Sequence, residues 1–471
     1  MTATSAGRTS GGGAGAAGVG AGGLALEVAR RLDRIPVGRW HRGVVTVVGL
    51  GCFFNFFEVA IGTLMVPLLP SEWTSTTLMT SMIIASTFVG ELVGALVLTP
   101  LADRFGRRRM FRINLIAYVV LALACAFAPD FATLVVLRLL IGVGLGAELA
   151  LVDSYLAELL PASHRGRLVT RCYAFGMLAV PIAGALAALL PVELWGASSW
   201  RWLLGLSATG AVVIWVMRRR LPESPRWLVA QDRGDEALRT LAEIEAAAGA
   251  PAAEPGAAAT LDGPAAQPEA APGPRPRLLR PPLLGRTTLA CLIEMLGPVG
   301  FYGFASIAPL VLLHKGFDVV ESLGYSALTA IGYPLGSLLL AVVADRVQRR
   351  TLTIAASLGV AVTGSVFGLA ESAWLIVVAG GLTTMLSVIQ ATVSRAYTAE
   401  MFPTAVRSTV IGRSYALSRL VAAVLPFVAL PVLAAFGAAV LYASCAVLIL
   451  AMSVSVALLG PRTNAAQLET I

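Results

Sequence analysis

The sequence is short of the charge that a water-soluble surface requires. Charged residues make up 13% of its 471 residues, whereas hydrophobic residues make up 57%. Soluble globular proteins carry about 25% charged residues, so this chain lacks the polar surface to cover itself in water. The composition therefore excludes a soluble globular fold and indicates that much of the surface faces lipid.

Cysteine, histidine and lysine are scarce as well. The five cysteines are scattered through apolar stretches without a CxxC motif, and the three histidines show no spacing typical of metal ligands. We therefore expect neither a disulfide framework nor a zinc site, and we interpret the cysteines as packing residues. Lys315 is the only lysine, so arginine carries nearly all of the basic charge.

Motifs of catalysis are also missing from the sequence. It contains no P-loop, no nucleophile–base pair and no metal cluster. The segment GVGLGAE at 142–148 resembles a dinucleotide-binding loop, but it lies inside an apolar stretch with no strand before it. We therefore expect the protein not to be an enzyme and to need no cofactor and no metal ion.

The arginines indicate how the chain lies in a bilayer. A net charge of +8 is compatible with a nucleic-acid partner, but the arginines cluster in short segments beside apolar stretches. Segments 30–42, 104–112 and 218–226 are rich in arginine, whereas the loops predicted on the opposite side hold few. The positive-inside rule places the arginine-rich side, and both termini with it, in the cytoplasm. We expect a multi-pass protein of the plasma membrane, with a lipid bilayer and no nucleic acid as partner.

Twelve apolar stretches are long enough to cross a bilayer, which takes about 17–25 residues. We therefore expect an all-α membrane protein with spans at 44–69, 78–100, 112–128, 131–157, 168–192, 200–217, 287–313, 319–343, 352–370, 373–397, 409–434 and 437–460. The predicted parts are a disordered tail with a short surface helix (1–43, the helix at 24–42), a six-helix bundle (44–217), a cytoplasmic loop and linker (218–286, with an amphipathic helix at 234–248), a second six-helix bundle (287–460) and a C-terminal tail (461–471).

The two predicted bundles are copies of one unit, offset by 242 positions. The recurring pairs include Gly90/Gly332, Gly94/Gly336, Asp103/Asp345, Arg104/Arg346, Arg107/Arg349, Tyr155/Tyr397, Glu158/Glu400 and Arg165/Arg407. Small residues such as Gly90 and Gly94 let helices approach closely. Parallel repeats in an apolar chain are typical of secondary transporters, whose substrate site lies between the halves.

Several motifs resemble those of the major facilitator superfamily, over nearly the whole chain. LADRFGRRR (101–109) resembles its signature between helices 2 and 3, and PESPRWL (222–228) is similar to the sugar-porter and organic-ion-transporter signature. RLLIGVGLGAEL (138–149) resembles helix 4 of the branch with niacin transporters and synaptic-vesicle-protein relatives. The resemblance implies two six-helix bundles, a central cavity and alternating access. Segment 291–310 lacks the glutamine pair of sugar porters, which argues against a hexose.

Charged residues at the predicted cytoplasmic ends are candidates for gating. A carboxylate at a helix end that faces arginine can latch one conformation, although plain anchoring by positive charge is the alternative. The latch candidates are Asp103, Arg104, Arg107, Asp345 and Arg346. The charge-relay candidates are Glu158, Arg165, Glu223, Arg226, Glu400 and Arg407, which would hold the outward-open state and separate on inward opening.

Charges inside the spans are costly and mark either a transport pathway or a paired structural site. The carboxylate candidates for the pathway are Glu58, Glu91, Glu148 and Glu294, which we place at similar depth on four spans. Arg138 matches the helix 4 arginine that the superfamily links to proton transfer. Arg419 either binds a substrate carboxylate or pairs with Glu58 or Glu91. Asp153 is predicted to pair with Arg171, and Tyr302 either stacks on an aromatic substrate or is a packing residue.

From these features we expect a proton-coupled secondary active transporter in a bacterial plasma membrane. It would take up a small organic acid, with aromatic acids among the candidates, and work as a monomer with protons as the coupling ion. Proton flow would use Glu58, Glu148 and Arg138. Two alternatives remain open at this stage: a proton antiporter that exports a drug or natural product, and a membrane sensor that binds a ligand without transport.

Overall fold

The computed structural model describes residues 21–461 except for 192, 220, 250–282, 344–345 and 403. Within this part the chain is almost entirely helical, as expected. A single short hairpin pairs β1 (Glu193–Leu194) with β2 (Ala197–Ser198) across a turn at Trp195 and Gly196, whose φ angles are positive. The predicted disordered tail up to residue 20, the Ala/Pro/Gly-rich linker and most of the C-terminal tail lie outside the described residues. Residues 21–23, which we also expected to be disordered, are helical.

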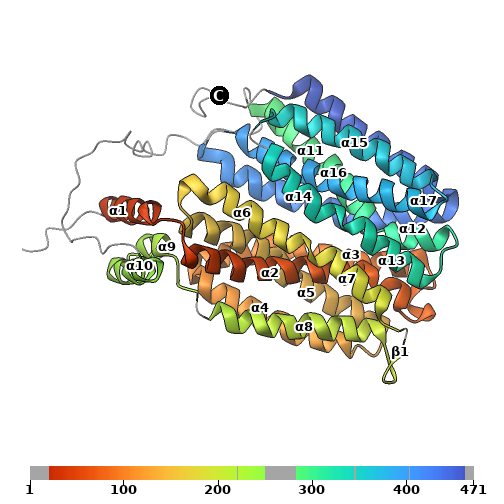
Figure 1. The fold of residues 1–471 in the computed structure, drawn as a ribbon, viewed down its shortest axis with the longest axis horizontal. Coiled ribbons are helices and arrows are strands. Elements are labelled where there is room, and N and C mark those ends of the chain that lie inside the picture. Colours follow the sequence, from red (N-terminus) through yellow and green to blue (C-terminus); the bar gives the residue numbers. More distant parts are fainter. Residues whose placement is uncertain are drawn as a thin grey trace, which may run out of the picture.

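Two bundles of helices lie side by side (Figure 1). The N-terminal half contains α2 (Arg39–Leu64), α3 (Thr77–Phe105), α4 (Arg107–Ala126), α5 (Phe131–Leu159), α6 (Ala162–Met177), α7 (Ala179–Leu189) and α8 (Ser199–Arg218), with short 3-10 turns η1 (Val66–Leu68) and η2 (Ser71–Thr74) between α2 and α3. The C-terminal half contains α11 (Leu283–Ala305), α12 (Ala308–His314), α13 (Val319–Ala330), α14 (Gly332–Val343), α15 (Arg349–Leu369), α16 (Ala373–Glu400) and α17 (Thr404–Leu459).

Proline and glycine explain why single predicted spans appear as pairs of helices, and why the last two spans appear as one. The break between α6 and α7 lies three residues before Pro181, and the break between α13 and α14 lies three residues before Pro334. Proline lacks the amide that would bond to the preceding turn. The 56-residue α17 contains two spans that bend at Gly437, where φ is 80°. That angle suits glycine, which has no Cβ. The twelve predicted spans are therefore confirmed.

Glycine also brings α3 and α5 into close contact, as the repeat predicted. A Cβ added to Gly94 would stand 1.9 Å from the carbonyl oxygen of Val143, and one added to Gly146 would stand 2.0 Å from that of Glu91. The second repeat has the same feature, because a Cβ on Gly336 would stand 2.4 Å from the carbonyl oxygen of Met385. Backbones in contact strengthen dispersion forces between helices where lipid removes the hydrophobic drive.

Three helices lie together beyond one end of the bundles: α1 (Ala21–Arg34), α9 (Pro225–Ala230) and α10 (Gly234–Ala248) (Figure 1). We call this the loop-helix end, and the opposite end, which carries β1 and β2, the hairpin end. The amphipathic helix predicted at 234–248 coincides with α10. The surface helix predicted at 24–42 is wrong in extent, because the chain breaks between α1 and α2 at Pro36, which disfavours a helical Ile35.

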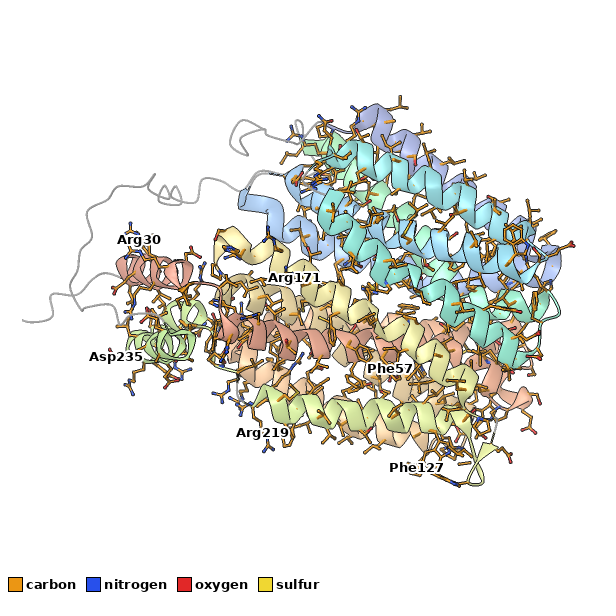
Figure 2. All side chains as sticks on the ribbon, in the orientation of Figure 1. Arg30, Phe57, Phe127, Arg171, Arg219 and Asp235 are labelled. Atoms are coloured by element: carbon orange, nitrogen blue, oxygen red, sulfur yellow. The ribbon has the colours of Figure 1, made fainter. Side chains whose placement is uncertain are left out.

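The outer faces of both bundles are apolar. Val120, Val213 and Val362 are 58–64% exposed on α4, α8 and α15. Figure 2 shows labelled charged side chains, such as Arg30 and Asp235, gathered at the loop-helix end. Apolar flanks with charged ends are the surface that a bilayer requires.

Candidate functional site

A cavity of about 260 Å³ lies between the two halves. Its walls come from α2, α5 and α6 on one side and from α11, α14, α16 and α17 on the other. Four charged residues line it: Asp153, Glu294, Arg395 and Arg419. A site at the interface of the repeats is the arrangement expected for a transporter.

The cavity reaches toward the loop-helix end. Asp153 lies six residues before the end of α5 and Arg395 five residues before the end of α16, about 8–9 Å from that surface. The deep end is closed by side chains shared with a smaller space of about 70 Å³ behind it, namely Phe56, Met177, Phe301 and Tyr302. Toward the hairpin end α7 meets α13, where a Cβ on Gly184 would stand 2.9 Å from the Cβ of Ala327.

Arg419 lies at the deep end of the cavity. It was predicted either to bind a substrate carboxylate or to pair with Glu58 or Glu91, and it pairs with Glu91. Its Nη1 lies 2.7 Å from Oε2 of Glu91 and donates to the hydroxyl of Tyr302. Its guanidinium also lies 4.6 Å from the ring centre of Tyr415. Glu91 and Arg419 are 2% and 4% exposed. This ion pair joins the N-terminal half to the C-terminal half.

Glu58 is engaged within the N-terminal half and does not pair with Arg419. Its Oε1 lies 3.0 Å from Nη1 of Arg138. Its Oε2 accepts hydrogen bonds from Tyr118 at 2.9 Å and from Ser207 at 2.6 Å. Both members of the pair are fully buried. Every charge in this cluster is therefore matched, as a buried ion requires.

Glu148 pairs with an arginine that the sequence did not single out. Arg218 contacts its Oε1, Asn114 donates to its Oε2 at 3.3 Å, and the Arg218 guanidinium lies 4.4 Å from the ring centre of Phe111. Arg218 stood in an arginine-rich segment that we assigned to topology, yet it is 1% exposed. Its position directly after the predicted span 200–217 was the one available signal.

Glu294 faces the cavity and differs in this from Glu58, Glu91 and Glu148. It is 6% exposed, and no hydrogen bond or ion pair joins it to another residue in the described part of the chain. Gln390 is close by, because a Cβ on Gly297, one turn along α11, would stand 2.9 Å from its Nε2. Gln390 occupies the position in the second repeat that Glu148 has in the first.

The predicted pair of Asp153 with Arg171 is not formed. Asp153 instead accepts a hydrogen bond of 2.7 Å from the hydroxyl of Tyr173, while Arg171 is exposed. Tyr173 lies two residues further along α6, and the rotation of α6 turns its side chain toward Asp153.

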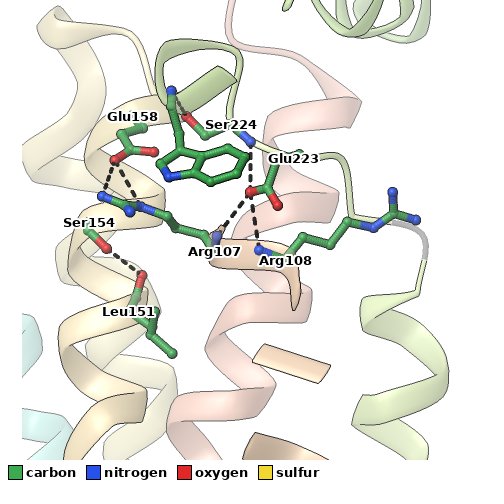
Figure 3. Close-up of polar contacts among 8 residues, drawn as sticks. Arg107, Arg108, Leu151, Ser154, Glu158, Glu223 and Ser224 are labelled. Atoms are coloured by element: carbon green, nitrogen blue, oxygen red, sulfur yellow. Dashed lines mark hydrogen bonds and ion pairs between the residues drawn. The ribbon is translucent and has the colours of Figure 1, made fainter. Parts of the chain in front are cut away.

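At the loop-helix end, a charge cluster joins α4, α5 and the segment before α9 (Figure 3). Arg107 lies 3.0 Å from Glu158 through Nη2 and donates to it from Nε at 3.2 Å. Glu223 accepts hydrogen bonds from the backbone amides of Arg107 and Arg108 at 3.1 and 3.2 Å. A carboxylate there caps α4 and complements the positive end of its dipole.

Other gating candidates are placed differently from expectation. Arg165 donates to the carbonyl of Leu160 at 3.2 Å rather than to Glu158, and Arg226 lies 3.6 Å from Asp33 of α1. In the second repeat Arg349 donates to Glu400 at 3.4 Å. Arg104 and Arg346 are exposed. The side chains of Asp103 and Arg407, and all of Asp345, lie outside the described part of the chain, so the latch stays a prediction.

Comparison with known proteins gives the family. The profile of the sugar (and other) transporter family matches residues 51–471. A putative metabolite transport protein, YyaJ of Bacillus subtilis, is 30% identical over 400 residues, which cover 83% of this chain and 86% of YyaJ. The niacin transporter NiaP of Acinetobacter baylyi is 28% identical over 449 residues, which cover 95% of this chain and all of NiaP.

Solved structures agree on the fold. The inward-open conformation of the xylose transporter XylE from E. coli superposes with a TM-score of 0.70 at 18% identity, over 91% of this chain and 98% of XylE. A partially occluded inward-open conformation of XylE gives a TM-score of 0.69. The resemblance in the motifs and the all-α fold with two six-helix bundles are thereby confirmed.

Proposed function

This chain belongs to the sugar (and other) transporter family of the major facilitator superfamily, and from that premise we propose that it is a proton-coupled transporter that takes up a small organic acid. Membership of the family makes the chain a multi-pass membrane transporter of a small molecule and not an enzyme. Substrate class, proton coupling and direction are the proposed parts, argued below from the site.

The central cavity is the observation that carries the proposal. It lies between the repeats, contains charge of both signs, and reaches toward one end of the molecule only. Because the loop-helix end bears the arginine-rich segments, we assign it to the cytoplasm, together with both termini. The conformation described is then inward-facing, which places the substrate cavity in contact with the compartment that receives the substrate.

Two arginines and an aromatic floor support an acid as the substrate. Arg395 and Arg419 present guanidinium groups, which bind carboxylates in paired hydrogen bonds. Phe301 and Tyr302 lie at the deep end with their ring centres 5.0 Å apart. The name of the relative NiaP refers to niacin, an aromatic carboxylic acid, which agrees with this class.

The ion pair of Glu91 with Arg419 supports coupling to protons. A substrate carboxylate at Arg419 would compete with Glu91 and leave that buried carboxylate without its counter-charge, which costs several kcal/mol. Protonation of Glu91 removes this cost. Binding of an acid anion and uptake of a proton therefore favour each other, and the coupling is reciprocal.

Glu58 and Arg138 give a second buried pair that a proton could neutralise. The pair lies entirely in the N-terminal half, with Tyr118 and Ser207 as further partners of the carboxylate. We assign proton transfer to Glu58, Arg138 and Glu148, and linkage between proton and substrate to Glu91 and Arg419.

Proton flux in liposomes tests the proposal. Purified protein is reconstituted with a pH-sensitive dye inside, and aromatic acids, other organic acids, amines and cationic drugs are added outside. We expect an acid to acidify the lumen faster than in protein-free liposomes, and Glu58→Gln to abolish the difference. Ligand binding without flux would contradict transport and favour a membrane sensor.

One observation favours a second candidate, a proton antiporter for a cation. Glu294 and Asp153 place two carboxylates on the cavity wall, and no ion pair or hydrogen bond joins Glu294 to another described residue. An antiporter would move protons outward from the lumen when amines or cationic drugs are added outside, and acids would have no effect. The same liposome panel therefore distinguishes the two functions by the sign of the dye signal.

A further inference from the structure

The cavity wall carries polar groups that the protein itself does not satisfy. In the described part of the chain, Oε1 of Gln390 and Oγ of Ser394 have no hydrogen-bond partner, although the two residues are 1% and 4% exposed. Nε of Arg419 is also buried without an acceptor. Unsatisfied buried groups cost about 1–3 kcal/mol each, so three of them in residues that line one cavity favour a ligand that reaches them when the cavity closes around it.

These groups fall into two chemical sets. Glu294 and Gln390 offer oxygen acceptors on neighbouring α11 and α16, and Ser394 lies one turn from Gln390 on the same face. Arg419 and Arg395 offer donors from α17 and α16. A ligand that satisfies both sets must carry a donor at one end and an acceptor at the other.

From this arrangement we propose that the cavity binds a zwitterion, an acid that also carries a protonated amine, and that Glu294 selects the amine. The proposal rests on the function proposed above and specifies its substrate class. The ammonium group would lie against Glu294 and Gln390, and the carboxylate against Arg395 and Arg419. Phe301 and Tyr302 would contact the apolar part between the two charges.

The charge of the site argues against ligands of one sign. A ligand with a single charge meets only one of the two sets, because Arg395 and Arg419 suit a carboxylate whereas Glu294 suits an amine. A simple acid anion would therefore approach Glu294 without relieving its charge. A simple amine would satisfy Glu294 but leave Nε of Arg419 without an acceptor. Opposite charges on one ligand meet both requirements, and a mismatched charge in such a site is strongly disfavoured.

Matched small molecules test the inference. 4-Methylbenzoate, 4-(aminomethyl)benzoate and 4-methylbenzylamine share a para-substituted benzene ring, and the first and third each lack one of the two charged groups of the second. Binding of each to the full-length protein in lipid nanodiscs is measured by titration calorimetry at pH 7, with the 3-substituted isomers alongside. We expect the zwitterion to bind at least about tenfold more tightly than either single-charge analogue, as for one hydrogen-bonded charge.

The variant Glu294→Gln keeps the size of the side chain and removes its charge. We expect it to reduce the advantage of the zwitterion over 4-methylbenzoate by about tenfold, while affinity for 4-methylbenzoate stays or improves. Ser394→Ala should lower zwitterion affinity more mildly, which supplies a second variant if Glu294→Gln folds poorly. Glu72→Gln, the same change at an exposed residue of η2, is the matched control and should have no effect.

The outcomes separate the inference from the function on which it rests. Equal affinity for 4-methylbenzoate and 4-(aminomethyl)benzoate overturns the inference and leaves an organic acid as substrate. Tighter binding of 4-methylbenzylamine than of the zwitterion overturns the inference and supports the cation antiporter. Binding of none of the six compounds to folded protein overturns both the inference and the proposed aromatic-acid class.

Discussion

At the scale of the residue, buried charge is handled in two ways. Glu58, Glu91 and Glu148 each form an ion pair with an arginine, whereas Glu294 faces the cavity and forms no ion pair with a described residue. An ion pair in a dry interior stabilises little over an apolar pair, but the loss of one member leaves a bare charge. Removal of one member of such a pair therefore costs more stability than replacement of both members.

This asymmetry predicts a specific pattern for the pair of Glu58 with Arg138. Arg138→Met should lower the free energy of unfolding by about 3–5 kcal/mol, because Glu58 remains buried without its cation. The double change Glu58→Gln with Arg138→Met should recover most of that loss. Thermal unfolding of Arg138→Met, Glu58→Gln and the double variant in detergent measures the effect. A double variant as unstable as the sum of the single variants would contradict the direct coupling seen here.

At the scale of the element, the crossing of α3 and α5 depends on the absence of side chains. Glycines on both helices let the backbones touch, and in the second repeat Gly332 and Gly336 of α14 lie similarly close to the backbone of α16. Helices that meet so closely resist sliding, since any side chain at the crossing would separate them.

Gly94→Ala tests this crossing. The new methyl group would stand 1.9 Å from a carbonyl oxygen, and overpacking of this kind costs about 1–3 kcal/mol. Gly205→Ala on α8 is the control, because a Cβ there has nothing within 4 Å, and it should be neutral or stabilising by up to about 1 kcal/mol. Melting temperatures in lipid nanodiscs compare the two. A milder effect at Gly94 than at Gly205 would exclude the close packing.

Glu223, which caps the start of α4 outside the membrane spans, should make the stability of the protein depend on pH. Burial raises the pKa of Glu223 above its usual value near 4.5, although amide hydrogen bonds from residues such as Arg108 oppose the change. A carboxyl group whose pKa is raised by folding contributes stability at low pH and loses it as pH rises through the raised pKa.

Glu223→Gln should therefore make the protein more stable than the parent above the usual pKa of glutamate, because glutamine stays uncharged. At pH 4 the variant and the parent protein should melt at similar temperatures, because Glu223 is then largely protonated. From pH 5 upward the parent should fall below the variant, until Glu223 is fully charged in the folded protein. Melting curves across this range give the difference. A variant that is less stable than the parent at pH 7 would show that the charged cap outweighs burial.

At the scale of the whole molecule, the two halves touch near the hairpin end and separate around the cavity toward the loop-helix end. Contact between α7 and α13 at Gly184 closes the side opposite the cavity. Alternating access requires this contact to open when the cavity closes.

Gly184→Trp should therefore hold the hairpin end apart. We expect transport to stop while the protein stays folded, because the indole cannot fit against Ala327. A cysteine at Thr170, on the cavity wall, reports the shift in a protein whose exposed Cys291 is replaced by serine. Its labelling from the loop-helix side should slow. Unchanged labelling together with normal transport would rule out this contact as a gate.

The sequence predicted the span pattern, the repeat and the family because these depend on composition and spacing. It did not predict which side chains meet. Arg218, Tyr118 and Tyr173 were not identified as partners of Glu148, Glu58 and Asp153. Such contacts depend on the rotation of each helix about its axis. A span that is apolar on every face contains no hydrophobic stripe from which that rotation can be read.

The pairing of Glu91 with Arg419 has a consequence for how the protein is made. The ribosome delivers α3 to the membrane more than three hundred residues before it delivers Arg419. During that interval the newly synthesised N-terminal half contains Glu91, whose partner Arg419 has not yet been synthesised. During insertion Glu91 must therefore be either protonated or in contact with water rather than with lipid. The second half of the chain then completes the electrical neutrality of the first.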